Sequence, residues 1–168
     1  MSSDAFVFYD SVDSLLARIS HSLRDSNLET KELSNEDLLE LESLFGQPLL
    51  GRALNLVYSN TPIKLYRTPN SVLQLLEVPG SKIDVVYKIY PGINFCTCES
   101  YRYWVIKHRQ QATCKHVLAT QLAQPLGRIR EEIVTDKAYI ELKAELIKQR
   151  LRSVQASNTS TGEGSSKH

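Results

Sequence analysis

Residues 96–119 read CTCESYRYWVIKHRQQATCKHVLA and contain all 3 cysteines of this 168-residue chain. Within this stretch, Cys96, Cys98, Cys114 and His116 form the pattern C-x-C-x15-C-x-H. Three thiols and one imidazole are a complete Cys3His donor set for tetrahedral zinc. Because four protein ligands leave no open coordination position, we expect one structural zinc ion at these residues.

The one-residue gaps within each ligand pair restrict the backbone that can carry the ligands. Positions i and i+2 point in nearly opposite directions on an α-helix but share one face of a strand. We therefore expect Cys96 and Cys98 to converge from the end of a strand, just after Phe95. Cys114 is expected in the loop before a helix, with His116 in the first turn of that helix.

Two other interpretations of these residues remain open. The cysteines and the histidine can be ordinary core residues, since isolated buried cysteines are common. Cys114 and His116 can also be the nucleophilic pair of a thiol enzyme, although nothing in the sequence supplies a third residue to orient them. Under the zinc interpretation, Lys115 between two ligands would offset the negative charge that three thiolates leave on the site.

The composition outside the motif is that of a globular protein, with 42% apolar and 23% charged residues. No apolar run approaches the roughly 20 residues that a membrane-spanning helix needs. The N-terminus lacks the cationic start of a signal peptide. These features predict an intracellular, soluble chain of one domain, or of one domain plus appendages. The odd number of cysteines argues against a disulfide framework.

Charge is distributed unevenly along the chain. Residues 1–50 contain 10 acidic and 3 basic residues, whereas residues 51–153 contain 16 basic and 8 acidic ones. The difference indicates either an acidic arm that faces a partner or covers a basic body, or two solvated surfaces of opposite bias.

The hydrophobic pattern changes period along the chain. Apolar residues at helical spacing predict helices over residues 10–25, over 34–46 with Ser34 as N-cap, and from Pro48 to about Tyr58. A period of two then predicts strands around 63–65, 72–78 and 83–89, separated by turns at Pro69-Asn70 and Pro79-Gly80. Further helices are expected over 99–111, over 115–124, and over 135–152 with Thr135 as cap.

These elements predict an α+β fold with N-terminal helices, a small antiparallel sheet, a zinc-stapled ββα-like finger and a C-terminal helix. The expected regions are an acidic helical region (1–48), the sheet with the finger (49–126, core motif 96–119), the C-terminal helix (127–153) and a disordered tail (154–168).

The motif resembles a known family. The pattern C-x-C-x(n)-C-x-H is that of SWIM-type zinc fingers, and here it continues as C-x-H-x-x-A from Cys114 to Ala119. The added alanine resembles the SWIM subunits of the Shu complex, which promotes homologous recombination. Ala119 lies three residues after His116, on the same helical face, where a small side chain lets the helix pack closely beside the metal. The resemblance extends from about Leu44 to Ala123 and is loose outside that segment.

The resemblance implies a non-enzymatic nuclear protein that pairs with a RecA-like recombinase paralogue. Such a complex supports the assembly or stability of recombinase filaments on single-stranded DNA. The zinc ligands carried over are Cys96, Cys98, Cys114 and His116, and the motif alanine is Ala119. No catalytic residue, membrane contact or small-molecule substrate is implied. The alternative is a stand-alone nucleic-acid-binding zinc domain.

Several side chains are candidates for contact with a partner or with nucleic acid. Basic and aromatic residues interleave in the finger, as on many single-strand-binding surfaces. The candidates are Arg102, Tyr103, Lys107, Arg109 and Lys115. Further bases are expected on the strands (Lys64, Arg67, Lys82, Lys88) and the C-terminal helix (Lys143, Lys148, Arg150, Arg152).

Two sets of apolar residues are open to more than one interpretation. Helical spacing with Val105 and His108 favours a core position for Trp104 over a stacking one. Leu15, Leu16 and Ile19 on the first helix are expected to face either a partner or the protein's own core.

Overall fold

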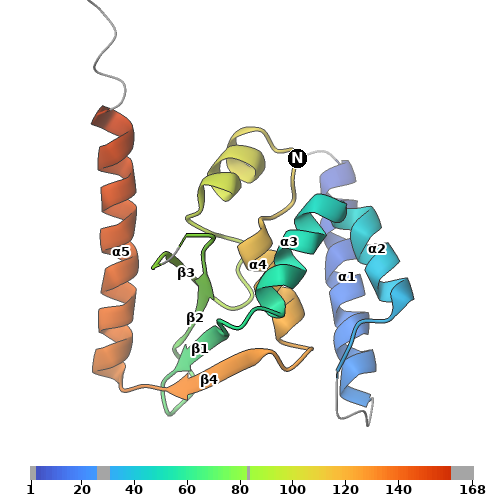
Figure 1. Cartoon of the computed structure of the whole chain (residues 1–168), viewed down its shortest axis with the longest axis horizontal. Coiled ribbons are helices and arrows are strands. Elements are labelled where there is room, and N and C mark those ends of the chain that lie inside the picture. The colour runs from blue at the N-terminus through green and yellow to red at the C-terminus, as the bar shows by residue number, and fades with distance from the viewer. Residues whose placement is uncertain (1–2, 26–30, 83, 160–168) are drawn as a thin grey trace, which may run out of the picture.

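The computed structural model describes residues 3–25, 31–82 and 84–159 (Figure 1). Its helices are α1 (Ser3–Asp25), α2 (Asn35–Phe45), α3 (Gln47–Val57), the short π-helix η1 (Tyr101–Lys107), α4 (Lys115–Ala123) and α5 (Asp136–Thr159). Its strands are β1 (Ile63–Arg67), β2 (Gln74–Pro79), β3 (Val86–Ile89) and β4 (Ile129–Ile133). The predicted α+β class is confirmed.

The four strands form one mixed sheet in the order β3-β2-β1-β4. The pairs β1–β2 and β2–β3 are antiparallel, as predicted. The expectation of a purely antiparallel sheet is wrong at β4, which pairs with β1 in parallel and was not predicted as a strand. Its sequence Ile-Arg-Glu-Glu-Ile has the charged residues that an edge strand tolerates, and a simple alternation of apolar residues is absent.

Two predicted strands begin later in the structure. Val72 and Leu73 belong to the β1–β2 turn, where the Val72 N–H donates to the Asn70 side chain at 3.2 Å and Leu73 O accepts from Thr68 N at 3.1 Å. In the β2–β3 loop, Gly80 N donates to Val85 O at 2.7 Å, so β3 starts only at Val86. Residue 83, the predicted start of β3, lies outside the described residues.

The helix ends show how local sequence sets the elements. Ser34 caps α2 in a capping box, because its hydroxyl accepts from Asp37 N at 3.1 Å while the Asp37 carboxylate accepts from Ser34 N at 3.2 Å. Thr135 caps α5 by accepting from Ala138 N at 3.2 Å. Helix α5 runs to Thr159, past the expected start of a disordered tail at residue 154, and residues 160–168 lie outside the described part.

One hydrophobic core joins the N-terminal helices to the sheet and the finger. Helices α3 and α4 pack against each other in its middle, with α1 and α2 on one side and α5 on the other (Figure 1). Leu15 and Ile19 of α1 are buried in this core and Leu16 packs against it, so these residues face the protein itself and not a partner. Within the described residues, no helix is both long and apolar enough to cross a bilayer.

Candidate metal centre

The four predicted ligands come from two segments that meet at the N-terminus of α4. Cys96 and Cys98 lie on irregular chain after the turn at residues 91–92, so the expected strand end is wrong, since β3 stops at Ile89. Cys114 is the N-cap of α4, in extended conformation, and His116 lies in the first turn. The expected loop position of Cys114 and helical position of His116 are both confirmed.

The geometry of the four side chains fits a zinc ion. All four are buried, and their donor atoms lie within 4.8 Å of one another. The Nδ1 atom of His116 is 3.8 Å from Cys96 Sγ and 4.0 Å from Cys114 Sγ. Sulfur and nitrogen ligands of a tetrahedral zinc lie about 3.5 Å apart, given Zn–S and Zn–N bonds of about 2.3 and 2.0 Å. The donor types and their separation therefore both suit one zinc ion.

The thiols favour a cation electrostatically. Hydrogen bonds to Cys114 and Cys96 lower the pKa of the Cys98 thiol, which also accepts from Tyr101 N at 3.3 Å. The pKa of Cys96 is raised by its hydrogen bonds to Cys114 and Cys98 and by burial. The pKa of Cys114 is lowered by Cys96, but its hydrogen bond to Cys98 and burial outweigh this and raise it to about 12. A divalent cation bound among the three sulfurs would favour the thiolate form of each of them.

His116 is oriented by packing rather than by a second hydrogen bond. Its ring lies 4.2 Å from the ring of Tyr87, centroid to centroid. Its buried Nε2 atom has no hydrogen-bond partner among the described residues. Burial raises the pKa of Tyr87, and the neighbouring sulfurs of Cys98 and Cys96 raise it further. The Nδ1 atom is thus the nitrogen turned toward the sulfurs.

Asn94 joins the two ligand-bearing segments, a role that the sequence analysis missed. Its side chain donates to Ala112 O at 2.9 Å and accepts from the Thr113 hydroxyl at 2.8 Å. Its carbonyl oxygen accepts from the Tyr101 hydroxyl. The bridge spans the two loops directly before Cys96 and Cys114. No local pattern marks this asparagine, because its partners lie 18 and 19 residues away.

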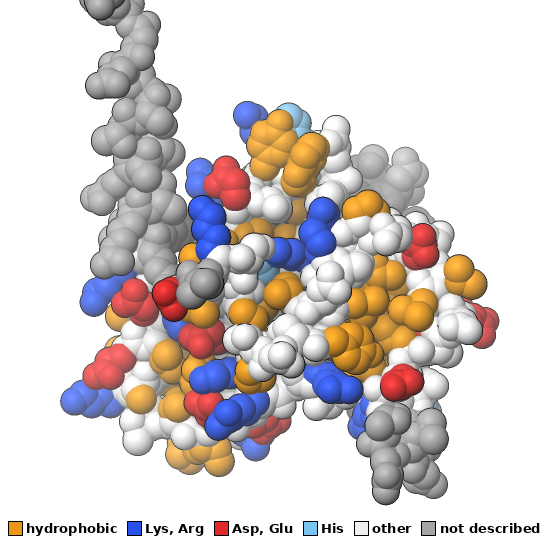
Figure 2. Space-filling view, in the orientation of Figure 1, with side chains coloured by type: hydrophobic (Ala, Val, Ile, Leu, Met, Phe, Trp, Pro, Cys, Tyr) orange, Lys and Arg blue, Asp and Glu red, His pale blue; other side chains and the backbone are white. Residues whose placement is uncertain are grey.

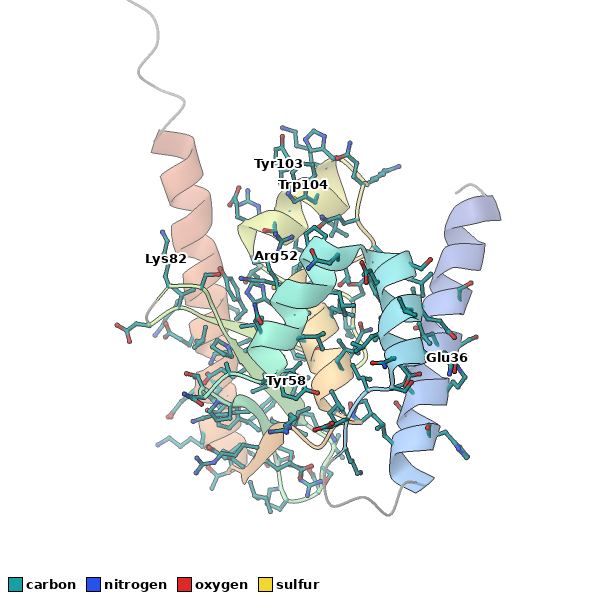
Figure 3. All side chains as sticks on the ribbon, turned by 45° about the vertical axis from the view of Figure 1, so that its right-hand side comes forward. Glu36, Arg52, Tyr58, Lys82, Tyr103 and Trp104 are labelled. Atoms are coloured by element: carbon teal, nitrogen blue, oxygen red, sulfur yellow. The ribbon has the colours of Figure 1, made fainter. Side chains whose placement is uncertain are left out.

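The segment between the second and third cysteines forms η1, not the predicted α-helix. Its hydrogen bonds run from i to i+5, as from His108 N to Tyr103 O at 3.0 Å. Tyr101 is buried and Val105 packs against the core. Trp104 is 39% exposed, so its predicted core position is wrong. A π-helix has more residues per turn than an α-helix, so residues at α-helical spacing no longer share one face. Trp104 therefore points outward (Figure 3).

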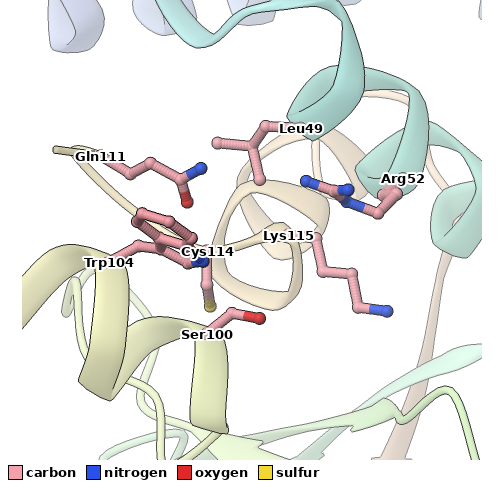
Figure 4. Close-up of a pocket in the computed structure, with 7 residues that line it drawn as sticks. All are labelled: Leu49, Arg52, Ser100, Trp104, Gln111, Cys114 and Lys115. Carbon is pink, nitrogen blue, oxygen red and sulfur yellow. The ribbon is translucent and has the colours of Figure 1, made fainter.

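The candidate contact residues of the finger lie mostly at the surface. Arg102, Lys107 and Arg109 are exposed, and Tyr103 is 42% exposed beneath the Lys107 ammonium, 5.6 Å from the ring centroid. The ammonium group of Lys115 donates to Ser81 Oγ at 2.5 Å, and its side chain points away from Cys114 (Figure 4). The charge compensation predicted for Lys115 stays a prediction.

The basic residues of the sheet are different. Lys88 is buried and pairs with Glu77 at 2.7 Å, so its expected surface position is wrong. Lys64 pairs with Glu132 at 3.4 Å and Arg67 with Glu131 at 2.9 Å. Lys82 and, on α5, Lys143 and Lys148 are exposed, whereas the side chains of Arg150 and Arg152 lie outside the described residues.

The motif alanine, Ala119, is a buried residue of α4. It is fully buried on α4, one turn after His116. Helix α4 packs against α3, whose Ala53 is also fully buried.

Three vertebrate proteins named zinc finger SWIM domain-containing protein 7 are similar to this chain. The Mus musculus protein is 29% identical over 136 residues, which cover 80% of this chain and 83% of that protein. The Homo sapiens protein is 27% identical over 131 residues (78% and 88%), and the Danio rerio protein is 25% identical over 127 residues (76% and 88%). No protein-family model and no solved structure matches the chain. The buried Cys3His group and these relatives together support a SWIM-type zinc finger in this chain.

Proposed function

We propose that this chain is a non-enzymatic, zinc-dependent adaptor of homologous-recombination repair in the nucleus. It pairs with a RecA-like recombinase paralogue, as in the Shu complex, and the pair promotes assembly or stability of recombinase filaments on single-stranded DNA. The observation that carries this proposal is the buried Cys3His group, whose four donors leave zinc no open position for a substrate. The C-x-H-x-x-A pattern with its buried Ala119 supports the assignment to this type of SWIM protein.

Zinc, when bound, supplies a cross-link and no reaction. Cys96 and Cys98 would hold it from the irregular segment, and Cys114 and His116 from α4. The ion would fix η1 against the N-terminus of α4, since η1 lies between Cys98 and Cys114 and begins three residues after Cys98. Its binding free energy would therefore contribute to folding.

Helix α5 offers a surface for the partner. Ile140 and Ile147 lie seven residues apart and are 63% and 55% exposed, and Ile133 of β4 is exposed beside the start of the helix. Positions seven apart share one helical face, which suits packing against another helix. The buried Leu15 and Ile19 leave no comparable surface on that face of α1.

Co-expression with a RecA-like paralogue from the same organism tests the pairing. We expect a zinc-containing heteromer that slows recombinase dissociation from single-stranded DNA. Replacing Ile140 and Ile147 together by glutamate should abolish co-purification, whereas Leu39→Glu should not. Leu39 is the matched control because it is equally apolar and 68% exposed, but lies on α2. A folded, zinc-loaded chain that pairs with no such paralogue would contradict the proposal.

A further inference from the structure

A pocket of about 190 Å³ opens beside the metal centre, between η1, α3 and the N-terminus of α4 (Figure 4). The guanidinium of Arg52 reaches into it from α3, and the indole of Trp104 lies across from Arg52. The amide of Gln111 and the hydroxyl of Ser100 supply polar groups, and no carboxylate lines the pocket. Arg52 has no hydrogen bond or ion pair with any side chain that the structure describes.

An aromatic cluster adjoins the pocket on η1. The ring of Tyr103 lies 4.7 Å from Trp104 and 4.3 Å from His108, and Trp104 lies 5.9 Å from His108. Tyr103 and Trp104 are both substantially exposed, at the end of the molecule farthest from the β1–β2 turn (Figure 3). Such rings are costly to leave in water and are suited to stacking against a planar ligand.

The charge around these rings is mostly positive. From residue 100 to the end of the finger at residue 119 the chain contains no aspartate or glutamate and has four basic residues, Arg102, Lys107, Arg109 and Lys115. Figure 2 shows blue side chains beside exposed hydrophobic ones at this end of the molecule, with a red acidic side chain next to them. Glu99 approaches Arg102 only at 4.0 Å and is itself strongly exposed. The surface therefore favours an anionic ligand.

We infer that this pocket and the aromatic cluster form a binding site for single-stranded nucleic acid. One base stacks on Trp104, and a neighbouring phosphate pairs with Arg52. Stacking on an exposed indole requires a base that is free of its own duplex, which favours a single strand over a double one. An acidic peptide would use the cations but would leave the exposed rings unexplained. The inference rests on the proposed function for where this chain would meet single-stranded nucleic acid. Binding of the strand to the pocket and the aromatic cluster does not itself require the recombinase paralogue.

Trp104 also reports on the site, because it is the single tryptophan of the chain. We would titrate the zinc-loaded full chain with an oligodeoxythymidylate and record intrinsic fluorescence. A saturable quench is expected, with the same midpoint as the anisotropy of the labelled oligonucleotide. A duplex of equal length should bind more weakly and quench less.

Variants separate the stacking contact from the phosphate contact. Trp104→Ala should weaken binding of the labelled oligonucleotide about 5- to 100-fold, whereas Trp104→Phe should retain most of the affinity. Arg52→Ala should reduce the slope of log affinity against log salt by about 0.7, the share of one phosphate contact on a single strand. Arg130→Ala, an exposed arginine on β4 at the other end of the molecule, is the matched control and should leave the slope unchanged.

Three results would overturn the inference. Absence of oligonucleotide binding at low salt would remove the site. Binding of the oligonucleotide to the zinc-loaded wild-type chain without a change in Trp104 fluorescence would place the contact elsewhere. An equal quench by polyglutamate that the oligonucleotide cannot displace would identify an acidic protein segment as the ligand. None of these results bears on co-purification with a recombinase paralogue, so the two proposals fail separately.

Discussion

The basic residues of the sheet and those around the metal centre have the same charge but different surroundings. On the sheet, Lys64, Arg67 and Lys88 each face a glutamate of a neighbouring strand. Around the metal centre, Arg52 has no such partner among the described side chains, and the finger itself contains no acid after Glu99. The sheet thus uses its cations to pair strands, while the finger leaves its cations for an external anion.

The two regions also differ in what holds them together. Strand pairing and a hydrophobic face stabilise the sheet, with β1 hydrogen-bonded on both sides. The finger has an irregular ligand segment and one short π-helix, and its ends meet at four buried donors. We therefore expect the finger to depend on metal and the sheet on its own contacts.

The largest effect should come from removing a ligand. Cys114→Ser leaves three donors for the ion and removes the N-cap sulfur of α4. Structural zinc contributes about 10–16 kcal/mol to folding in zinc-finger peptides, which is as much as the whole stability of many domains. The variant should lose zinc by native mass spectrometry and lose its folded circular dichroism at 25 °C.

Thr97→Ser is the control for that loss, since residue 97 lies between two ligands without being one. It should retain one zinc ion and cooperative unfolding. A metal-free Cys114→Ser variant that stays fully folded would show that protein contacts alone stabilise the finger, as they do the sheet. If the wild-type chain also showed rapid alkylation of Cys114, the thiol-enzyme interpretation would be favoured.

On the sheet, the largest charge effect should come from Lys88. Its side chain is 3% exposed and that of Glu77 is 19% exposed, so Lys88→Met leaves a largely buried carboxylate without its cation. We expect a loss of about 3 kcal/mol in the free energy of unfolding. This value is at the low end of the range for a broken buried ion pair because the Glu77 carboxylate is partly exposed to water. Urea unfolding measures this loss. Glu77→Leu added to Lys88→Met should restore most of it.

Lys64→Met is the matched exposed case. Its pair with Glu132 is about one-third exposed on each side, so solvent screening limits the loss to below about 1 kcal/mol. Equal losses for Lys64→Met and Lys88→Met would show that burial does not set the strength of these sheet pairs.

The ligand set could be predicted from sequence because zinc ligation depends on residue type and spacing. The positions of Cys114 and His116 followed from the same spacing. The N-cap role of Ser34 followed from the residue types that cap helices. Trp104 could not be placed, since its exposure depends on a π-helix that the α-helical period does not describe. Strand β4 was missed because its charges pair with β1 across a long connection. Asn94 and Arg52 act through contacts that no local pattern records.

Two asparagines offer a finer comparison of the regions. Asn94 bridges the two ligand-bearing loops, whereas Asn70 holds the β1–β2 turn by accepting from Thr68 Oγ1 at 2.6 Å and from Val72 N at 3.2 Å. Asn94→Ala and Asn70→Ala should each cost about 1–2 kcal/mol, since each removes two hydrogen bonds at partly exposed positions. Asn94→Ala should also weaken zinc retention against a chelator by about 10-fold, and Asn70→Ala should not. Equal zinc retention in the two variants would mean that the metal alone orders the loops.

The smallest expected effect on stability comes from replacing Arg52, and a small effect would show that Arg52 does not stabilise the fold. Because Arg52 pairs with no described side chain, Arg52→Ala should change the free energy of unfolding by less than about 0.5 kcal/mol in urea. A cation retained beside an indole without a stabilising partner has its use outside the fold, which is the role inferred for it with single-stranded nucleic acid. A loss as large as that of Lys88→Met would instead make Arg52 a structural cation, and the contrast between finger and sheet would disappear.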